Sequence, residues 1–438
     1  MNLRAGSLFM IPSCHKVLCL IFVALSVPSP VVAQSDHRDH FEMHHWDDYV
    51  GSYEIGSGRY LAIGLNWGGG LTYLDTGTGR FGTLTDSTDG RYADNSGSSI
   101  RFVQGPSGMI TEVRWHEDGY PEQVANALGL KRENLTIPNG DGVLAGTLIL
   151  PPGIGPHPAI IHSGGASWIV REQVMNEALV YASHGIAAFI YDKRGWGEST
   201  GDKTVPFETS AGDIVAISDY LRQNRTDLNP KQIGISTYSQ SGWYGTLAAS
   251  TSDDIAFLIL NVPSATTVYR QEFQRVEHEL RADGFSPEQI GEALSLMNLM
   301  SQFSRTGEGW DEYIALREVA SEQPWFRYLF APKTADPENW RWGRMNWEYN
   351  PLPALTKIAA PVLVLLGEHD KKVLPEVNRS IFEMALDAAG NRDFEIMIIP
   401  GMNHALVVSQ RGGRTEETPN QMVPEVIQLR IQWLKSRL

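Results

Sequence analysis

The chain has 438 residues, of which 42% are hydrophobic and 20% are charged, and its net charge at pH 7 is −15. This length predicts two or three domains with enough apolar side chains for packed cores. The composition excludes a disordered chain, a collagen-like repeat and a small disulfide-rich scaffold. The excess of acidic residues argues against nucleic acids and anionic membrane surfaces as general partners.

Residues 1–33 have the pattern of a cleaved secretory signal. The basic residues Arg4 and Lys16 precede an apolar run over 17–25, and small residues end the segment at Ala33. The run is shorter than the roughly 20 residues that cross a bilayer, which favours a signal peptide over a membrane anchor. We therefore expect cleavage after Ala33 and a secreted or periplasmic protein without a membrane span.

Both cysteines, Cys14 and Cys19, lie inside this first segment. The mature chain would then contain no cysteine, and so no disulfide, no thiolate metal site and no cysteine nucleophile. Removal of Arg4 and Lys16 would also make the net charge two units more negative.

Residues 34–49 place four histidines among carboxylates, at positions His37, His40, His44 and His45. Such residues can bind a divalent metal, but their spacing defines no closed site. We expect a solvated N-terminal segment, and we expect the protein to need no metal or organic cofactor.

Residues 50–130 contain short apolar stretches at a spacing close to ten residues. The stretches lie at 60–63, 71–74, 100–103 and 110–115, with turn-forming segments at 68–70, 88–90 and 105–108. This pattern predicts a small antiparallel β-barrel or sandwich. We expect an accessory domain that packs on the rest of the protein, with a ligand-binding or substrate-gating module as the alternative.

Residues 131–262 and 351–438 show a different pattern, in which near-continuous apolar strands alternate with amphipathic helices. The strands are expected at 143–150, 158–162, 186–191, 232–236, 255–260, 361–366 and 394–399. Such alternation predicts an α/β fold with a mostly parallel, doubly wound sheet. In these sheets the functional residues lie just beyond the carboxyl ends of the strands.

Residues 263–350 interrupt this pattern without a strand signal. Ser286 and Gln289 form a capping-box pattern, with Pro287 at the first helical position. Apolar residues then recur at helical spacing, and five tryptophans follow or flank them, at Trp310, Trp325, Trp340, Trp342 and Trp347. The segment is predicted to form a helical cap over one edge of the sheet.

The best candidate nucleophile is Ser239, at the junction of a buried strand and an alanine-rich helix. A serine on such a turn has its hydroxyl lifted clear of the sheet, and the helix N-terminus stabilises negative charge beside it. The usual pattern, G-x-S-x-G, has glycines two positions on either side, whereas this chain has Thr237 and Ser241. The larger residues put the geometry of the turn in question. Ser236 and Ser241 fit the pattern less well.

Two further residues complete a possible triad. Asp370 follows the next-to-last strand in the run Gly367–Asp370, and His404 follows the last strand. A serine nucleophile needs a base to accept its proton, and the base needs an acid to orient it. The chain order Ser239, Asp370, His404 is the order typical of this architecture.

A glycine-rich turn follows an earlier apolar strand, in the run His162-Ser163-Gly164-Gly165-Ala166. Its backbone can direct an amide at a developing oxyanion, and the amide of Gln240 would supply the second donor. Gly164 is the preferred donor of this turn, with Gly165 as the alternative. His162 is expected to be structural.

Together these features resemble the α/β-hydrolase superfamily over residues 135–438. The run YDKRGWGES at 191–199 resembles the D-x-R-G-x-G-x-S loop of its secreted esterases and dipeptidyl-peptidase-like members, and SQSGW at 239–243 is similar to their nucleophile elbow. The family implies a structural role for Asp192 and Arg194, which would pin the strand end. Small β modules like the predicted N-terminal domain are also attached to such hydrolases.

The resemblance and the candidate triad predict a secreted serine hydrolase, most simply a carboxylesterase that acts on a small ester. The first alternative is a serine peptidase, such as an aminopeptidase or acylaminoacyl hydrolase, acting on a short peptide. An aminopeptidase needs carboxylates for the substrate amine, and Glu272, Glu277 and Glu279 are available in the cap. The second alternative is a non-catalytic binding protein on a hydrolase scaffold.

Overall fold

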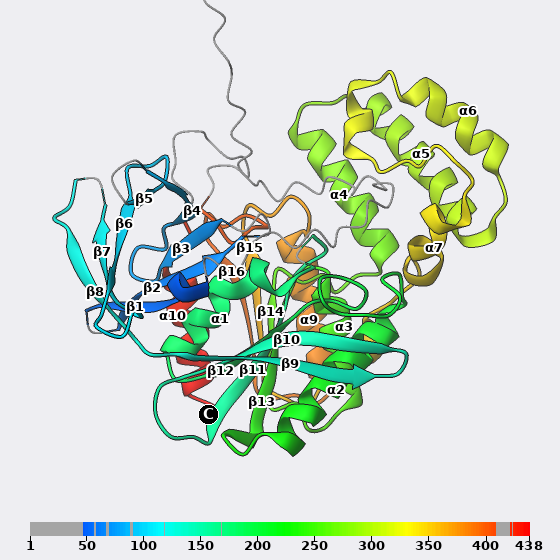
Figure 1. Cartoon of the computed structure of the whole chain (residues 1–438). Helices are drawn as coiled ribbons and strands as arrows, with labels where there is room; N and C mark the ends of the chain where they lie inside the picture. The colour runs from blue at the N-terminus through cyan, green and yellow to red at the C-terminus, as the bar shows by residue number, and fades with distance from the viewer. Residues whose placement is uncertain are drawn as a thin grey trace, which may run out of the picture.

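The computed structural model describes residues 47–408 and 421–438, apart from residues 57, 67–69, 88–90, 118, 168 and 423. The predicted signal sequence, both cysteines and the four histidines of the N-terminal segment lie outside the described residues, as does the predicted turn at 88–90. Figure 1 shows three parts: a barrel, a central sheet with its helices, and a group of helices beside that sheet.

The N-terminal part is a closed antiparallel barrel, which resolves the expected barrel or sandwich. Its strands are β1 (Gly51–Gly56), β2 (Arg59–Leu65), β3 (Leu71–Asp75), β4 (Phe81–Asp86), β5 (Tyr92–Ala93), β6 (Ser99–Gln104), β7 (Ile110–His116) and β8 (Gln123–Ala127). β1 pairs with both β2 and β8, which closes the barrel. Fully buried side chains such as Leu61, Ile63, Tyr73 and Trp115 fill its interior.

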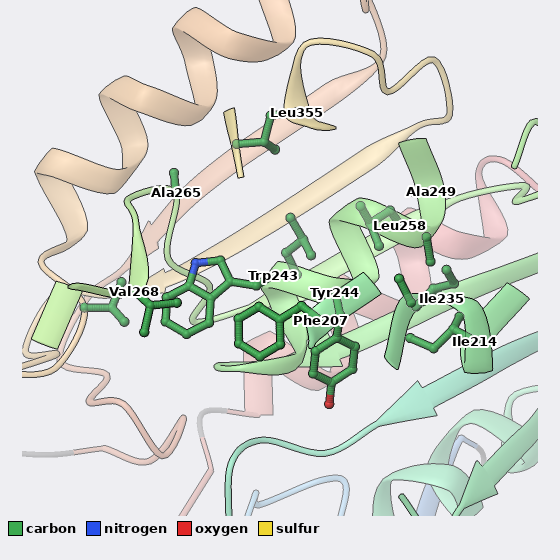
Figure 2. Packing of buried hydrophobic residues seen from close by; sticks show 14 of the residues in the cluster. Phe207, Ile214, Ile235, Trp243, Tyr244, Ala249, Leu258, Ala265, Val268 and Leu355 are labelled. Atoms are coloured by element: carbon green, nitrogen blue, oxygen red, sulfur yellow. The ribbon is translucent and has the colours of Figure 1, made fainter. Parts of the chain in front are cut away.

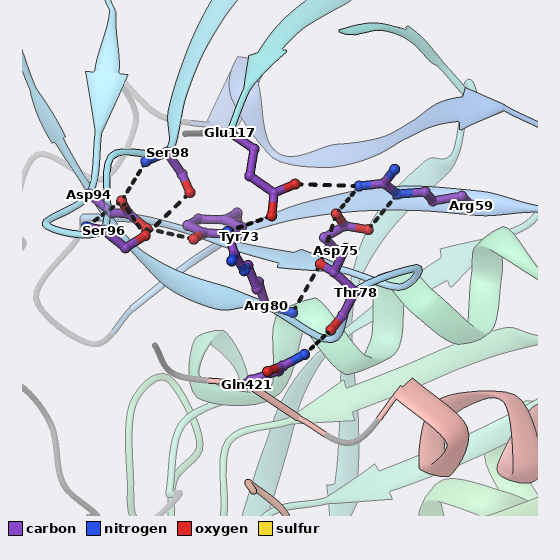
Figure 3. Close-up of polar contacts among 10 residues, drawn as sticks. All are labelled: Arg59, Tyr73, Asp75, Thr78, Arg80, Asp94, Ser96, Ser98, Glu117 and Gln421. Atoms are coloured by element: carbon purple, nitrogen blue, oxygen red, sulfur yellow. Dashed lines mark hydrogen bonds and ion pairs between the residues drawn. The ribbon is translucent and has the colours of Figure 1, made fainter. Parts of the chain in front are cut away.

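Ion pairs join the β2, β3 and β4 region of the barrel, as Figure 3 shows. Nε of Arg59 donates to Asp75 at 2.9 Å, and Arg80 lies 2.5 Å from Glu117. Both carboxylates are almost fully buried. Burial of a carboxylate is unfavourable unless it is paired, and these pairs supply the counter-charge.

The barrel shares a hydrophobic cluster with helices α1 (Met175–Ser183) and α10 (Pro424–Lys435). In addition, the Ser52 hydroxyl donates to the carbonyl oxygen of Leu179 at 3.4 Å, and Asn176 Nδ2 donates to Thr72 at 3.1 Å. Figure 1 shows α1 and α10 between the barrel and the central sheet. The barrel is therefore an integral part of one hydrophobic core.

The central sheet has eight strands in the order β16-β15-β14-β13-β11-β12-β10-β9. They are β9 (Lys131–Asn139), β10 (Gly142–Leu150), β11 (His157–Ser163), β12 (Ala187–Tyr191), β13 (Leu228–Tyr238), β14 (Leu258–Asn261), β15 (Val362–Gly367) and β16 (Phe394–Ile399). From β12 to β16 all neighbours are parallel, whereas β9 and β10 form an antiparallel edge. The mostly parallel sheet confirms the predicted fold class.

The opposite face of the sheet is covered by α2 (Phe207–Asn224), α3 (Ser241–Thr251) and α9 (Pro375–Ala388). One face of α2 is fully buried, at Ile214, Ile217 and Leu221. Figure 2 shows aromatic side chains of α2 and α3 packed against the strands. Phe207 stacks on Trp243, with ring centroids 5.5 Å apart.

Between β14 and β15 the chain forms helices without a strand: α4 (Val268–Ala282), α5 (Pro287–Thr306), α6 (Trp310–Ala320), α7 (Pro337–Asn346) and α8 (Leu352–Leu355), with a 3-10 turn at Pro324–Tyr328. The predicted capping box of Ser286 and Gln289 begins α5. Three of the five tryptophans, Trp325, Trp340 and Trp347, are buried among these helices. They belong to the same hydrophobic cluster as the face of the sheet that α2, α3 and α9 cover.

Candidate active site

Ser239 occupies a strained turn at the centre of the sheet. β13 ends at Tyr238 and α3 begins at Ser241, and Ser239 between them has a φ of 52°. Such a positive φ is unfavourable for a side chain with a Cβ and needs support from its surroundings. The support comes from Asn261 at the end of β14, whose carbonyl oxygen accepts the Ser239 amide at 2.9 Å.

The two residues that depart from the glycine pattern are both accommodated. A Cβ on Gly245 would come within 2.3 Å of Cγ2 of Thr237, so the missing side chain on α3 makes room for the threonine. Ser241 is fully buried, and its Oγ accepts the Tyr238 amide at 2.6 Å and lies 2.9 Å from the carbonyl oxygen of Ser163. The serine hydroxyl thus ties the elbow to the glycine-rich turn.

The structure brings Ser239, His404 and Asp370 together in one hydrogen-bonded chain. His404 Nε2 lies 2.9 Å from Oγ of Ser239, and His404 Nδ1 lies 2.7 Å from Oδ2 of Asp370. The side chain of Asp370 is fully buried, whereas that of His404 is 18% exposed. This arrangement can activate the serine, because the ring can accept its proton while the carboxylate stabilises the resulting charge.

Asp370 and His404 are each held by further contacts. The other oxygen of Asp370, Oδ1, accepts the amides of Lys372 at 2.8 Å and Val373 at 2.9 Å, which fixes the carboxylate. The Tyr238 hydroxyl donates to the backbone carbonyl of His404 at 3.2 Å. Tyr238, which precedes the candidate nucleophile, therefore also holds the loop of the candidate base.

The glycine-rich turn lies directly beside Ser239. A Cβ on Gly165 would lie 3.5 Å from Cβ of Ser239 and 3.3 Å from the carbonyl oxygen of Tyr238, so the glycine permits this close approach. Within the described part of the chain, the amides of Gly164 and Gln240 donate no hydrogen bond. The proposed role of these two amides as oxyanion donors stays a prediction.

Below the site, buried charges link β11, α1 and α10. His162 Nε2 lies 2.7 Å from Glu177, and Arg430 lies 3.4 Å from the same carboxylate. Burial alone would raise the pKa of Glu177, but Arg430 and His162 outweigh it and lower the pKa to about 2. His162 is fully buried and belongs to this cluster. That agrees with its expected structural role.

The D-x-R-G loop after β12 is built around two paired side chains. Asp192 accepts the amides of Arg171 and Glu198, each at 2.9 Å. Arg194 donates to Asp213 through two nitrogens, at 3.1 Å and 2.5 Å. Such contacts are expected for residues that hold the end of β12 in place.

A cavity of about 240 Å³ lies beside the elbow, between the D-x-R-G loop, α2, α3 and the cap helix α7. Its lining includes Gln240, which follows Ser239 in the chain, and Ala166, which follows the glycine-rich turn. The wall is formed mainly by aromatic and basic side chains, including Tyr191, Tyr244, Phe207, Trp342, Lys193 and Lys203. Trp342 alone among the five cap tryptophans lines this cavity.

The cap carboxylates named above are engaged on helix α4 itself. Arg275 binds Glu272 at 3.0 Å and Glu279 at 2.6 Å, and Arg281 binds Glu277 at 2.7 Å. They therefore form pairs along one helix rather than an open acidic site.

Over the described residues, histidine, cysteine and carboxylate side chains form no cluster suited to a metal ion. None of the helices in that same part of the chain has the length and apolarity to cross a membrane.

Sequence analysis missed several residues that shape this site. One is Asn261, which supports the elbow. It comes at the end of an apolar strand, as Asp370 does, and this place in the sequence could have identified it. The cavity-lining role of Lys193 has no sequence signal, because it depends on packing between the loop and the cap.

Known structures with a similar fold include several hydrolases. One is the α/β hydrolase GrgF of Penicillium sp. sh18, which is 18% identical in sequence and gives a TM-score of 0.45. The match covers 71% of this chain and 99% of GrgF. Another is the Pyrococcus furiosus esterase Pf2001, which is 16% identical and gives a TM-score of 0.45. That match covers 70% of this chain and 92% of the esterase. No curated protein gives a significant match.

A model of the alpha/beta hydrolase family matches residues 148–417. This range spans more than half of the chain. It contains the strained serine turn, the glycine-rich turn, the D-x-R-G loop and the loops of Asp370 and His404. The protein is therefore a member of the alpha/beta hydrolase family.

Proposed function

We propose that the protein hydrolyses carboxylic esters through an acyl-enzyme formed on Ser239. The observation that carries the proposal is the hydrogen-bonded chain from Ser239 through His404 to Asp370. Ser239 Oγ attacks the ester carbonyl while His404 Nε2 takes its proton, and Asp370 stabilises the imidazolium. The imidazolium then gives the proton to the leaving alcohol, and a water molecule, activated by His404, releases the acid.

The amides of Gly164 and Gln240 are the proposed donors to the oxyanion. Gln240 lies at the N-terminal end of α3, where the helix dipole adds positive potential. Loss of one such donor typically raises the barrier by about 3 kcal/mol. Gly165 supports the same function, because its lack of a side chain lets the turn lie against Ser239.

An ester substrate is favoured over a peptide with a free amino terminus. An aminopeptidase needs unpaired carboxylates near the nucleophile, but Glu272 and Glu279 are bound by Arg275. Turnover of aminoacyl anilides compared with short-chain aryl esters separates the two activities. We expect the aryl esters to be cleaved faster.

The direct test is Ser239→Ala with a short-chain aryl ester. We expect turnover to fall to background, and a fluorophosphonate probe to label the wild type but not this variant. Ser295→Ala, on an exposed face of α5, is the matched control and should keep both properties. Undiminished turnover by Ser239→Ala would refute the assignment. An unlabelled and inactive wild type would instead favour a binding protein on a hydrolase scaffold.

We further propose that residues 1–33 direct export, which rests on the sequence pattern alone. Expression in a bacterial host with its export pathway should yield a protein outside the cytoplasm that begins at Gln34. An exported protein that retains residues 1–33 would contradict cleavage at Ala33.

A further inference from the structure

The cavity beside the elbow carries an excess of positive charge. Of its basic residues, Arg194 is neutralised by Asp213. Lys193 and Lys203 also line the cavity, and neither has a carboxylate within ion-pair distance among the residues described. Lys203 lies instead over the ring of Trp196, 5.5 Å from its centroid. Neither lysine forms an ion pair with a carboxylate of the described residues, and a cavity lined by two such cations is suited to an anionic group.

Lys193 is the cation nearest to the candidate chemistry. Its ammonium donates to the carbonyl oxygen of Gly165, the glycine that lies against Ser239. An ammonium has three donors, so this contact leaves two for another group. Burial without an acidic partner lowers the pKa of Lys193 to about 7. A bound anion would restore the missing counter-charge.

The position of the cavity indicates which half of an ester would enter it. The leaving alcohol must receive a proton from His404, so it has to lie on the side of that ring. None of the three triad residues lines the cavity. Its lining does include Gln240 and Ala166, which lie on the proposed oxyanion side of Ser239. The group that extends into the cavity is therefore the acyl chain.

We propose that the cavity binds an acyl chain with a terminal carboxylate, so that the substrate is a monoester of a dicarboxylic acid and Lys193 pairs with the free carboxylate. This inference rests on the proposed ester hydrolysis at Ser239. The aromatic wall of Phe207, Tyr244 and Trp342 covers the methylene chain, and the cation binds its end. The volume of about 240 Å³ admits a short chain.

The first test measures binding without turnover. We expect monomethyl adipate to bind to the Ser239→Ala protein in calorimetry, and methyl hexanoate, its uncharged counterpart, to bind more weakly. Adding Lys193→Met should weaken adipate binding by about tenfold to a hundredfold, the range expected for a charge-assisted hydrogen bond. Lys231→Met, at the exposed opposite end of β13, makes the same charge change and should leave binding intact.

The second test measures turnover of 4-nitrophenyl monoadipate and 4-nitrophenyl hexanoate. We expect the wild type to prefer the adipate in kcat/KM and Lys193→Met to lose that preference while it still cleaves the hexanoate. Equal binding of monomethyl adipate with and without Lys193, or an equal fall in both turnovers, would overturn the proposal and leave Lys193 as a positioning residue for the Gly165 turn. Adipate binding without any turnover by the wild type would refute ester hydrolysis but retain the anion site.

Discussion

The amide of Met422 donates a hydrogen bond to the carbonyl oxygen of Gly79 at 2.7 Å, and this bond joins the C-terminal part of the chain to the barrel. Next to it, Gln421 Nε2 donates to the carbonyl oxygen of Thr78 at 2.7 Å, as Figure 3 shows. Met422 also forms a β-bridge with Val407, three residues after His404. The barrel therefore supports the loop that carries the candidate base.

This support predicts a catalytic effect of a substitution that is remote from the triad. Gln421→Ala removes one bond from the barrel, so we expect stability to fall by about 1 kcal/mol. Because the loop of His404 is then held less firmly, kcat on an aryl ester should fall severalfold with little change in KM. Urea unfolding and steady-state kinetics measure the two effects. Gln104→Ala, on an exposed position of β6, is the control, and equal behaviour of both variants would contradict the role of the barrel.

The contacts of Asp370 predict the result of removing its charge. Asp370→Asn can still accept the amides of Lys372 and Val373, so the fold should be retained. The amide cannot stabilise the imidazolium of His404, and kcat should fall about a thousandfold or more, as it does in serine hydrolases that use such a triad. Aryl ester kinetics and circular dichroism test this expectation. Asp387→Asn, at an exposed position on α9, should retain full activity. Near-normal activity of Asp370→Asn would remove Asp370 from the mechanism.

The pairing of Thr237 with Gly245 predicts a compensating pair of substitutions. Gly245→Ala places a methyl group against Cγ2 of Thr237 and should destabilise the protein by about 1–3 kcal/mol. Thr237→Ala removes the colliding methyl, so the double variant should recover most of that loss. Chemical unfolding of the two single variants and the double variant gives the coupling energy. Additive effects would show that the two residues do not compete for the same space.

The sequence predicts the residues whose position alone defines their role. Asp370 and His404 each follow an apolar strand, and because parallel strands end at one edge of the sheet, the side chains meet Ser239 there. The accommodation of Thr237 was not predictable in this way. It depends on Gly245, eight positions later on a packed helix, and on the buried hydroxyl of Ser241. Periodicity identifies elements and their ends, but it carries no information about which side chains share a space.

The same limit explains two details of the fold that were not predicted. β9 was not predicted, because its side chains are almost all exposed or half-buried and show no apolar run. The N-terminal domain was expected to pack on the rest of the protein, as it does, but the helices on which it packs, α1 and α10, were not predicted. That attachment arises from surfaces of separate elements that fit together only in three dimensions.

The anionic substrate proposed for the cavity predicts a pH dependence that separates Lys193 from His404. With a pKa near 7, Lys193 is protonated below that pH, and its charge is lost as the pH rises. Among the groups around it, Arg194 remains charged in its pair with Asp213, and burial raises the pKa of Tyr191 and Tyr244 above 10. The preference for 4-nitrophenyl monoadipate over the hexanoate should therefore be greatest in acid and decline as the pH rises from 6 to 9.

Any pH effect on the chemical step that the two esters share cancels in this ratio of kcat/KM values. Two variants sharpen the measurement. Lys193→Met should give a ratio that is low and independent of pH, because the ammonium proposed to pair with the acyl carboxylate is absent. Lys193→Arg should keep a preference at pH 9, because a guanidinium stays protonated there. A wild-type ratio that stays constant from pH 6 to 9, or one that rises with pH, would show that the ammonium of Lys193 does not bind the acyl carboxylate.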